Sequence, residues 1–339
     1  MDTHKKYVFA DYHHGNLYAS LHLLFEKRLG YELIRPIGME WAEQGWWKIH
    51  EPYGFALDTA GQYLDINDRQ WDSYENLNGD YKLKDDIYQI YDPENKIQHK
   101  AVTFEKFKEM KFDLIIASHP LHSNWEELLK YQPQAKFIQQ LGNENQTTTT
   151  KNVMSSVWQY EPLEGQNVIY YHQEFNVPKY TPPTNHDTIN SFIINMPEVD
   201  TFEIYKSALP EFKMKAYGLG NPDGPVENLE QSMRDSAFGF HLKFWDGYGH
   251  LIHTWAALGR PLIVRGDWYE GKTGGLLLED GVTCIDISKH TFEESLELIR
   301  FWAQPENHVK MCENMHKKFK EVCDFDKEAK QIKDYLISL

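Results

Sequence analysis

The chain has 339 residues, which predicts about two domains, because a single hydrophobic core seldom serves more than ~250–300 residues. Hydrophobic residues at 41% and charged residues at 25% exclude a disordered chain. The net charge of -16 argues against binding nucleic acid or an anionic membrane by general electrostatic attraction, although a local basic groove is compatible with it.

The cysteines and the N-terminus indicate the compartment. Cys284, Cys312 and Cys323 lack metal-ligand spacing, and their odd number argues against a disulfide framework. The N-terminus passes from a short charged lead directly into an apolar strand, and no apolar run approaches the ~20 residues that span a bilayer. We therefore expect free thiols in a cytoplasmic protein that has no membrane partner.

The first half of the chain alternates segments of strand and helix type. A strand at 7–10 precedes a helical apolar repeat that ends at Gly30. Residues 41–91 are rich in aromatic side chains, Asp and Gly without a clear period, which predicts an insertion. Further strands are expected at 31–36, 112–118, 135–139 and 167–171. Such continuous apolar strands predict a parallel sheet covered by helices on both faces.

A second α/β half follows a linker at 177–187 that is rich in Pro, Thr and Asn. Its expected strands are 189–195, 213–217, 238–243, 261–264 and 283–287. The tail after Thr291 has a helical pattern. The predicted domains are 1–180, with the insertion at 41–91, then 181–310, and a helical tail at 311–339.

Residues 238–261 combine an apolar strand, a glycine turn and a short helix. Asp246, Gly247, Tyr248 and Gly249 form the turn, and the helix that follows stops at Gly259. The N-terminus of such a helix offers unpaired N–H groups and the positive end of its dipole. The pattern predicts a binding site for an anion such as a diphosphate.

This run resembles the C-terminal donor-site signature of GT-B glycosyltransferases, which bind a sugar nucleotide. The signature has an acidic residue, Gly, an aromatic residue and Gly, then a helix and a Gly-x-Pro turn. The matching residues are Asp246, Gly247, Tyr248, Gly249, Gly259 and Pro261. The family usually has a second carboxylate eight residues after the first, for the donor ribose, and this chain has Thr254 there.

The resemblance implies an α/β protein of GT-B fold, with two Rossmann-like doubly wound domains facing across a cleft. The first domain would hold the acceptor and the second the donor. The C-terminal helix would cross back onto the first domain. The nucleotide sugar would be a co-substrate rather than a cofactor, and this interpretation requires no metal.

Ligands of doubly wound sheets lie beyond the carboxyl ends of the strands, so polar residues there are candidates. Asp11, His13 and His14 follow the first strand and are predicted to provide the general base toward an acceptor hydroxyl. The alternative for the two histidines is that they cap the first helix. The predicted acceptor-binding residues are Gly15, His119, His172 and Glu174.

Sugar transfer builds negative charge on the departing diphosphate, so fixed cations beside the donor lower the barrier. Lys243, three residues before Asp246, is the first candidate for this catalytic role. The other predicted donor-binding residues are Lys215, Gly218, Gly220, His250, Thr254, Arg265 and Lys272. The string from Gly266 to Thr273 also matches a P-loop, but too little helix follows it, and a turn near the donor phosphates is preferred.

The resemblance implies a hexosyl- or pentosyltransferase that uses a nucleotide sugar, with a UDP-sugar as the expected donor. The opening of the chain and the turn at 246–250 also resemble GT-B proteins encoded by phages, some of which glycosylate modified DNA bases. A hydroxylated or hydroxymethylated base of phage DNA is therefore one acceptor to consider, since a flipped base needs only a local groove.

Two alternatives remain open. Thr254, in place of the usual carboxylate, is compatible with a catalytically silent nucleotide- or sugar-binding protein. Repeated histidines are compatible with a metal-dependent hydrolase. Its metal ligands would come from His13, His14, His119, His122, His250 and His253.

Overall fold

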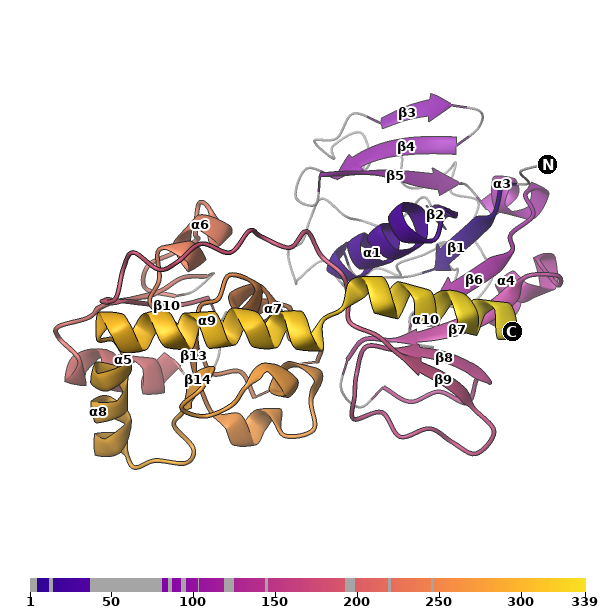
Figure 1. Ribbon diagram of the computed structural model, residues 1–339. Coiled ribbons are helices and arrows are strands. Elements are labelled where there is room, and N and C mark those ends of the chain that lie inside the picture. Colours follow the sequence, from indigo (N-terminus) through magenta and orange to yellow (C-terminus); the bar gives the residue numbers. More distant parts are fainter. Residues whose placement is uncertain are drawn as a thin grey trace. The chain divides into compact units, whose positions relative to one another are not determined.

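The computed structural model divides into two compact units, drawn in Figure 1. The first comprises Met1–Ser156, Tyr160–Asn176 and Phe325–Leu339, and the second comprises Val157–Gln159 and Val177–Asp324. The residues that the structure describes are 5–11, 15–36, 81–84, 87–92, 96–102, 104–118, 125–143, 146–192, 199–218, 221–244 and 247–339.

The described part of the first unit is built on a nine-stranded sheet. Its strands are β1 (Tyr7–Asp11), β2 (Glu32–Pro36), β3 (Tyr81–Lys84), β4 (Ile87–Asp92), β5 (Ile97–Val102), β6 (Leu114–Ala117), β7 (Lys136–Leu141), β8 (Asn152–Ser155) and β9 (Asn167–Tyr170). The strand order is β3-β4-β5-β2-β1-β6-β7-β8-β9. The strands from β5 to β9 in this order pair in parallel, whereas β4 is antiparallel to both of its neighbours.

Helices cover both faces of this sheet. They are α1 (Gly15–His22), the π-helix η1 (Leu23–Arg28), α3 (Phe104–Glu109), α4 (Trp125–Tyr131) and α10 (Phe325–Ser338). Because consecutive strand residues point to opposite faces, Val8 and Ala10 pack in a core with α1, η1 and α10. Phe9, between them, packs with Phe107 of α3 and Leu128 of α4.

The second unit has a five-stranded parallel sheet of order β11-β10-β12-β13-β14. Its strands are β10 (Thr188–Ser191), β11 (Lys213–Ala216), β12 (Phe238–His241), β13 (Leu262–Val264) and β14 (Cys284–Asp286). Its α-helices are α5 (Val199–Ala208), α6 (Leu229–Arg234), α7 (His250–Ala257), α8 (Phe292–Trp302) and α9 (Pro305–Val322). Two 3-10 helices, η5 (Gly266–Tyr269) and η6 (Thr273–Leu277), follow β13.

Local sequence signals explain where several of these helices begin. Thr291 and Glu294 form a reciprocal capping box at the start of α8, and the Asn228 side chain caps α6. Pro305 occupies the first position of α9, where its missing N–H costs nothing. The tail is therefore helical as predicted, and it is divided into three helices.

Most strands lie where the sequence predicted them. Four strands in the first unit were not predicted. They are β5, β8 and the hairpin strands β3 and β4 at the end of the aperiodic region 41–91. The strand expected at 189–195 ends at Ser191, and residues 41–80 of the predicted insertion lie outside the described residues.

The compact units divide the chain at Val177 and Phe325, where the sequence suggested 181 and 311. Residue 311 lies inside helix α9, which belongs to the second unit, and the final helix α10 belongs to the first. Across the described ranges, no helix is both long and apolar enough to cross a membrane.

Candidate functional site

The strand order of the second unit defines where a ligand is expected. The chain passes from β10 to β11 on one side and then to β12 on the other side of β10. In such sheets the ligand crevice lies outside the carboxyl ends of the strands at this reversal. The segment that leaves β12 there is residues 242–249, which contains the predicted donor turn.

The turn ends at Gly249, which has a left-handed conformation with φ of 81° and directly precedes helix α7. This conformation strains residues that have a Cβ atom, so glycine is the residue suited to the turn. The Gly249 carbonyl accepts the first helical bond, from the His253 N–H at 3.1 Å. The first amides of α7 precede this bond and are the groups that a helix leaves available to an anion.

Aromatic stacking between the turn and helix α7 fixes the turn. The buried Tyr248 ring stacks on the buried His253 ring with centroids 4.1 Å apart, and it meets His250 edge-on at 4.9 Å. His253 Nδ1 in turn donates to the Gly249 carbonyl at 2.9 Å. The predicted residues Tyr248, Gly249 and His250 are thus held together at one helix terminus.

Thr254, which replaces the usual second carboxylate, is engaged within its own helix. Its hydroxyl donates to the His250 carbonyl at 2.9 Å. A hydroxyl in this position has no negative charge and is already bonded, so it differs from a carboxylate that would accept a ribose hydroxyl.

Two hydrogen bonds connect the loop after β12 to the loop after β13. Lys272 Nζ donates to the Phe244 carbonyl at 3.0 Å, and the Tyr269 hydroxyl donates to the Lys243 carbonyl at 3.1 Å. The predicted cations Lys243 and Lys272 therefore belong to one connected loop pair, although they lie 29 positions apart (272 − 243).

The P-loop interpretation does not fit the observed backbone. The segment after Lys272 is the 3-10 helix η6, whereas a P-loop is followed by an α-helix. The buried Thr273 hydroxyl accepts a hydrogen bond from the Trp158 N–H at 3.1 Å.

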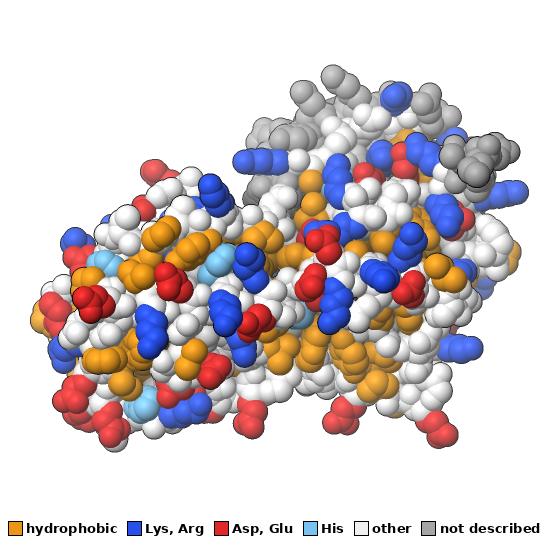
Figure 2. All heavy atoms as spheres, viewed as in Figure 1, with side chains coloured by type: hydrophobic (Ala, Val, Ile, Leu, Met, Phe, Trp, Pro, Cys, Tyr) orange, Lys and Arg blue, Asp and Glu red, His pale blue; other side chains and the backbone are white. Residues whose placement is uncertain are grey.

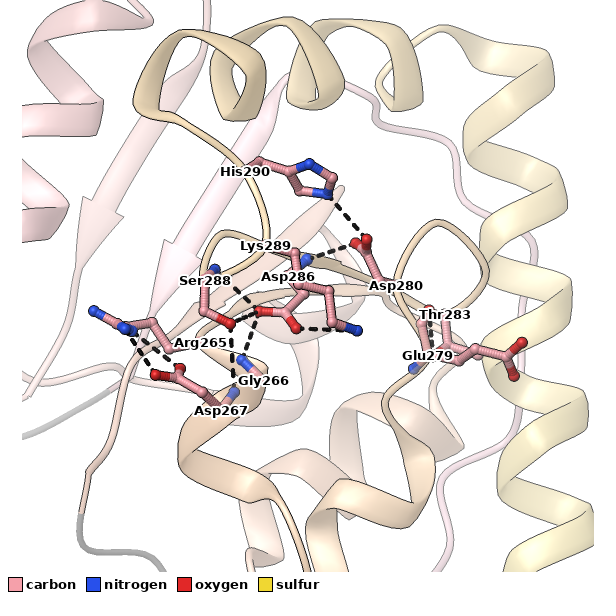
Figure 3. A network of polar contacts seen from close by, with 10 residues as sticks. All are labelled: Arg265, Gly266, Asp267, Glu279, Asp280, Thr283, Asp286, Ser288, Lys289 and His290. Atoms are coloured by element: carbon pink, nitrogen blue, oxygen red, sulfur yellow. Dashed lines mark hydrogen bonds and ion pairs between the residues drawn. The ribbon is translucent and has the colours of Figure 1, made fainter.

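Figure 3 shows a polar network at the carboxyl ends of β13 and β14, centred on Asp286. Asp286 Oδ1 accepts hydrogen bonds from the Gly266 N–H at 2.7 Å and from the Ser288 hydroxyl and N–H at 2.6 and 3.1 Å. A Cβ atom on Gly266 would lie 2.1 Å from Asp286 Oδ2, so only glycine allows this approach. The network fixes the backbone that carries Arg265.

The Asp286 pKa reflects this bonding. Burial by itself would raise the pKa, but the hydrogen bonds from Ser288 and Gly266 outweigh burial and lower it. Asp286 is therefore an ionised structural group, and Lys289 Nζ lies 3.5 Å from it.

Arg265 is paired with Asp267 in a bidentate contact. Arg265 Nε and Nη2 donate to the two carboxylate oxygens at 3.1 and 2.7 Å. The hydrogen bond raises the pKa of Arg265 and lowers that of Asp267. The guanidinium also lies over the Trp268 ring, 5.2 Å from its centroid.

Two further predicted donor residues, Lys215 and Gly218, lie on β11 and directly after it. Lys215 is exposed within the strand rather than beyond its end, and its Nζ lies 5.9 Å from the Tyr217 ring centroid. Gly218 follows the strand, and its N–H donates to the Gly224 carbonyl at 2.8 Å. Asp246 and Gly220 lie outside the described residues.

In the first unit, the segment after β9 carries two predicted acceptor residues. His172 Nδ1 donates to Glu328 Oε1 at 2.6 Å, and the His172 N–H donates to Glu328 Oε2 at 2.7 Å. Glu174 accepts two hydrogen bonds from Arg28 at 2.6 and 2.7 Å. Arg28 also contacts Asp326, so helix α10 and the end of η1 position this segment.

Asp11 is buried at the carboxyl end of β1, and Gly15 begins α1. His13, His14, His119 and His122 lie outside the described residues, so the structure does not place these candidates for a base or a metal. Of the proposed metal ligands, the structure describes His250 and His253, and both contact the Tyr248 ring.

The sequence patterns did not mark the residues that support these segments, above all Asp267, Asp286, Ser288 and Glu328. The rule that ligands lie beyond strand ends would have singled out Asp286, because it ends a strand. No local signal marks Glu328, which is one of several charged residues on an amphipathic helix.

No protein-family model matches the sequence, and no curated protein sequence matches it. Solved structures do resemble it. A glycosyltransferase from Rickettsia africae superposes with a TM-score of 0.60 and 10% identity over 98% of both chains. Anabaena HepE in complex with UDP-glucose gives 0.56 and 13%, over 99% of this chain and 100% of HepE.

The pneumococcal O-GlcNAc transferase GtfA, in complex with UDP and GlcNAc, gives a TM-score of 0.56 at 9% identity over 99% of both chains. At these identities a likeness shows the fold. Two doubly wound units of Rossmann type, together with these superpositions, show that the chain has the GT-B fold of these glycosyltransferases.

Proposed function

We propose that the protein is a glycosyltransferase that moves a sugar from a nucleoside diphosphate sugar to an acceptor hydroxyl. The observation that carries the proposal is the left-handed Gly249 that opens α7 at the carboxyl end of β12. In a unit of GT-B fold, this helix N-terminus would adjoin the expected ligand crevice. The loops that carry Lys243 and Lys272 are hydrogen-bonded to each other, which supports a shared role beside the donor.

The chemistry of the proposal depends on stabilising the leaving diphosphate. The amides of the 247–249 turn and of the first turn of α7 would bind phosphate oxygens, and Lys243 and Lys272 would offset the charge that grows on them. The reaction then needs no metal, since protein cations and dipoles perform the neutralisation.

For the donor, a UDP-sugar is the first candidate, because HepE and GtfA are described in complex with UDP-glucose and with UDP. The bonded Thr254 hydroxyl predicts that the ribose is held without the usual carboxylate. Either a hexose or a pentose would suit this description of the donor.

On the acceptor side, Asp11 at the end of β1 is the proposed general base, with His172 and Glu174 contributing to the acceptor site. A hydroxymethylated DNA base is one acceptor to test. Figure 2 shows basic and acidic side chains interspersed over α9 and α10 on the face drawn, and an acceptor groove for DNA would need a more basic surface than that.

The test begins with thermal unfolding in the presence of UDP, GDP, ADP and dTDP sugars, because a ligand of the folded state raises its apparent stability. We expect at least one to raise the melting temperature and to be slowly hydrolysed. With that donor, Lys243→Ala should lower turnover by about 100-fold, as removal of a transition-state donor does.

Lys213→Ala is the matched control, because Lys213 begins β11 at the opposite end of the sheet and pairs with Asp187. It should leave turnover unchanged. Donor binding without turnover across an acceptor panel would support the silent binding protein instead, and turnover that a chelator abolishes would support the metal hydrolase. Absence of any nucleotide binding would overturn the proposal.

A further inference from the structure

Arg265 lies at the proposed donor edge, but its guanidinium is occupied by a neighbouring carboxylate. Both nitrogens that face Asp267 make hydrogen bonds to it, at 3.1 and 2.7 Å (Figure 3). The side chains of Arg265 and Asp267 are 42% and 44% exposed. This ion pair is therefore open to solvent and to an incoming anion.

The position of the pair is built into the network around Asp286. Gly266 lies between the two paired residues in the chain, and its N–H donates to Asp286 Oδ1. The Asp267 N–H donates to the Ser288 hydroxyl at 3.4 Å. The backbone on either side of the pair is fixed, so exchange of partners needs only side-chain rotation.

We propose that Asp267 is a built-in competitor of the donor diphosphate: it pairs with Arg265 in the free protein, and the diphosphate takes its place on the guanidinium. This inference rests on the proposed function, because it requires a nucleoside diphosphate at the carboxyl edge of this sheet. The proposed function names residues that bind the nucleotide, and this inference adds one residue, Asp267, that lowers the affinity for it.

A carboxylate and a phosphate can replace each other on the Arg265 guanidinium. A guanidinium forms the same forked pair of hydrogen bonds with a carboxylate or a phosphate, and a diphosphate carries more negative charge than a carboxylate. Because an exposed ion pair is weak, its loss is a small penalty that the phosphate contact exceeds. When the product diphosphate leaves, Asp267 recovers Arg265, which favours release.

The experiment measures the dissociation constant of UDP by calorimetry, and of GDP, ADP and dTDP if UDP does not bind. Asp267→Asn keeps the shape of the side chain and removes its charge. We expect it to bind the nucleotide about three- to tenfold more tightly than the wild type, with a steeper loss of affinity at high salt.

Two controls separate competition at Arg265 from a general effect of charge. Glu211→Gln removes an equally exposed carboxylate from an ion pair, with Arg300, at the opposite end of the same sheet. It should leave UDP affinity within twofold of wild type, an estimate based on screening of distant exposed charges. In the Arg265→Gln background, Asp267→Asn should produce no gain.

The proposal is overturned if Asp267→Asn binds the nucleotide no more tightly than the wild type. A gain that persists without Arg265, or that Glu211→Gln reproduces, also overturns it. These outcomes leave the proposed function standing, because the wild type still binds the nucleotide. If none of the four diphosphates binds either protein, the proposed function and this inference fail together.

Discussion

Gly266 and Asp286 illustrate how single residues define the candidate site. The carboxylate reaches the end of β13 only because glycine leaves room for it, and three donors then converge on Oδ1. Asp286 is only 3% exposed, so removing its charge leaves buried N–H and O–H groups without a strong acceptor. We regard Asp286 as a positioning residue for the loop that begins at Arg265.

We predict that Asp286→Asn lowers the free energy of unfolding by about 1–3 kcal/mol in urea at neutral pH. Ser288→Ala removes one donor and should cost about 1 kcal/mol. Because the folded-state pKa of Asp286 lies below its usual 3.8, its stabilisation is complete above pH 3.8 and is lost as pH falls through the lowered value. The difference between wild type and Asp286→Asn should therefore shrink in acid, and a constant difference would contradict this account.

At the scale of elements, His308 connects helix α9 to the amino end of β12. Its Nε2 donates to the Ala237 carbonyl at 2.8 Å, and its Nδ1 accepts from His186 Nδ1 at 2.8 Å. Burial first, and then the nearby His186 and Arg260, lower the pKa of His308 to about 4. The neutral ring is the form that fits this arrangement.

This arrangement predicts a loss of stability in mild acid. The lowered pKa means that the stabilisation is complete above the usual 6.5 and disappears as pH falls toward about 4. This stabilisation is on the order of 3 kcal/mol, because each unit of difference in pKa between the folded and unfolded states is worth about 1.4 kcal/mol. His308→Gln, which retains a donor and an acceptor, should flatten the dependence of unfolding free energy on pH across that window. An equal slope in both proteins would show that His308 is not responsible.

At the scale of the molecule, the last helix completes the core of the first unit. Ala329, Ile332, Tyr335 and Leu336 pack with residues of the sheet, and the Tyr335 hydroxyl donates to the Asn167 carbonyl at 2.9 Å. The same helix provides Glu328 and Asp326, which hold the segment after β9 and Arg28. The first unit therefore depends on helix α10, which the sequence of the second unit separates from the rest of it, for its full stability.

We predict that Ile332→Ala lowers the free energy of unfolding of the first unit by about 2–5 kcal/mol, because it leaves a cavity in that core. Ile337→Ala, on the same helix, should change it by less than about 0.5 kcal/mol. The two positions differ in exposure, 1% for Ile332 and 72% for Ile337. Hydrogen exchange of the β1 and β6 amides measures the stability of this unit. Similar losses of unfolding free energy at both positions would contradict the packing described here.

The sequence by itself determined the features that depend on near neighbours. Apolar runs located most strands, because burial on both faces of a parallel sheet excludes polar residues from them. Gly249 and Gly259 marked the ends of α7, because helix termini have characteristic backbone requirements. The strand β8 was missed, because four residues after a polar run have no readable period.

Only the tertiary structure decided which distant side chains meet. Asp286 reaches Gly266, Lys272 reaches Phe244, and Glu328 reaches His172 across 156 positions. It also showed that the Thr254 hydroxyl donates to the His250 carbonyl and that Asp267 forms an ion pair with Arg265. Periodicity reports burial of one segment at a time, whereas these contacts depend on the close approach of strand ends and helices that the chain brings together only on folding.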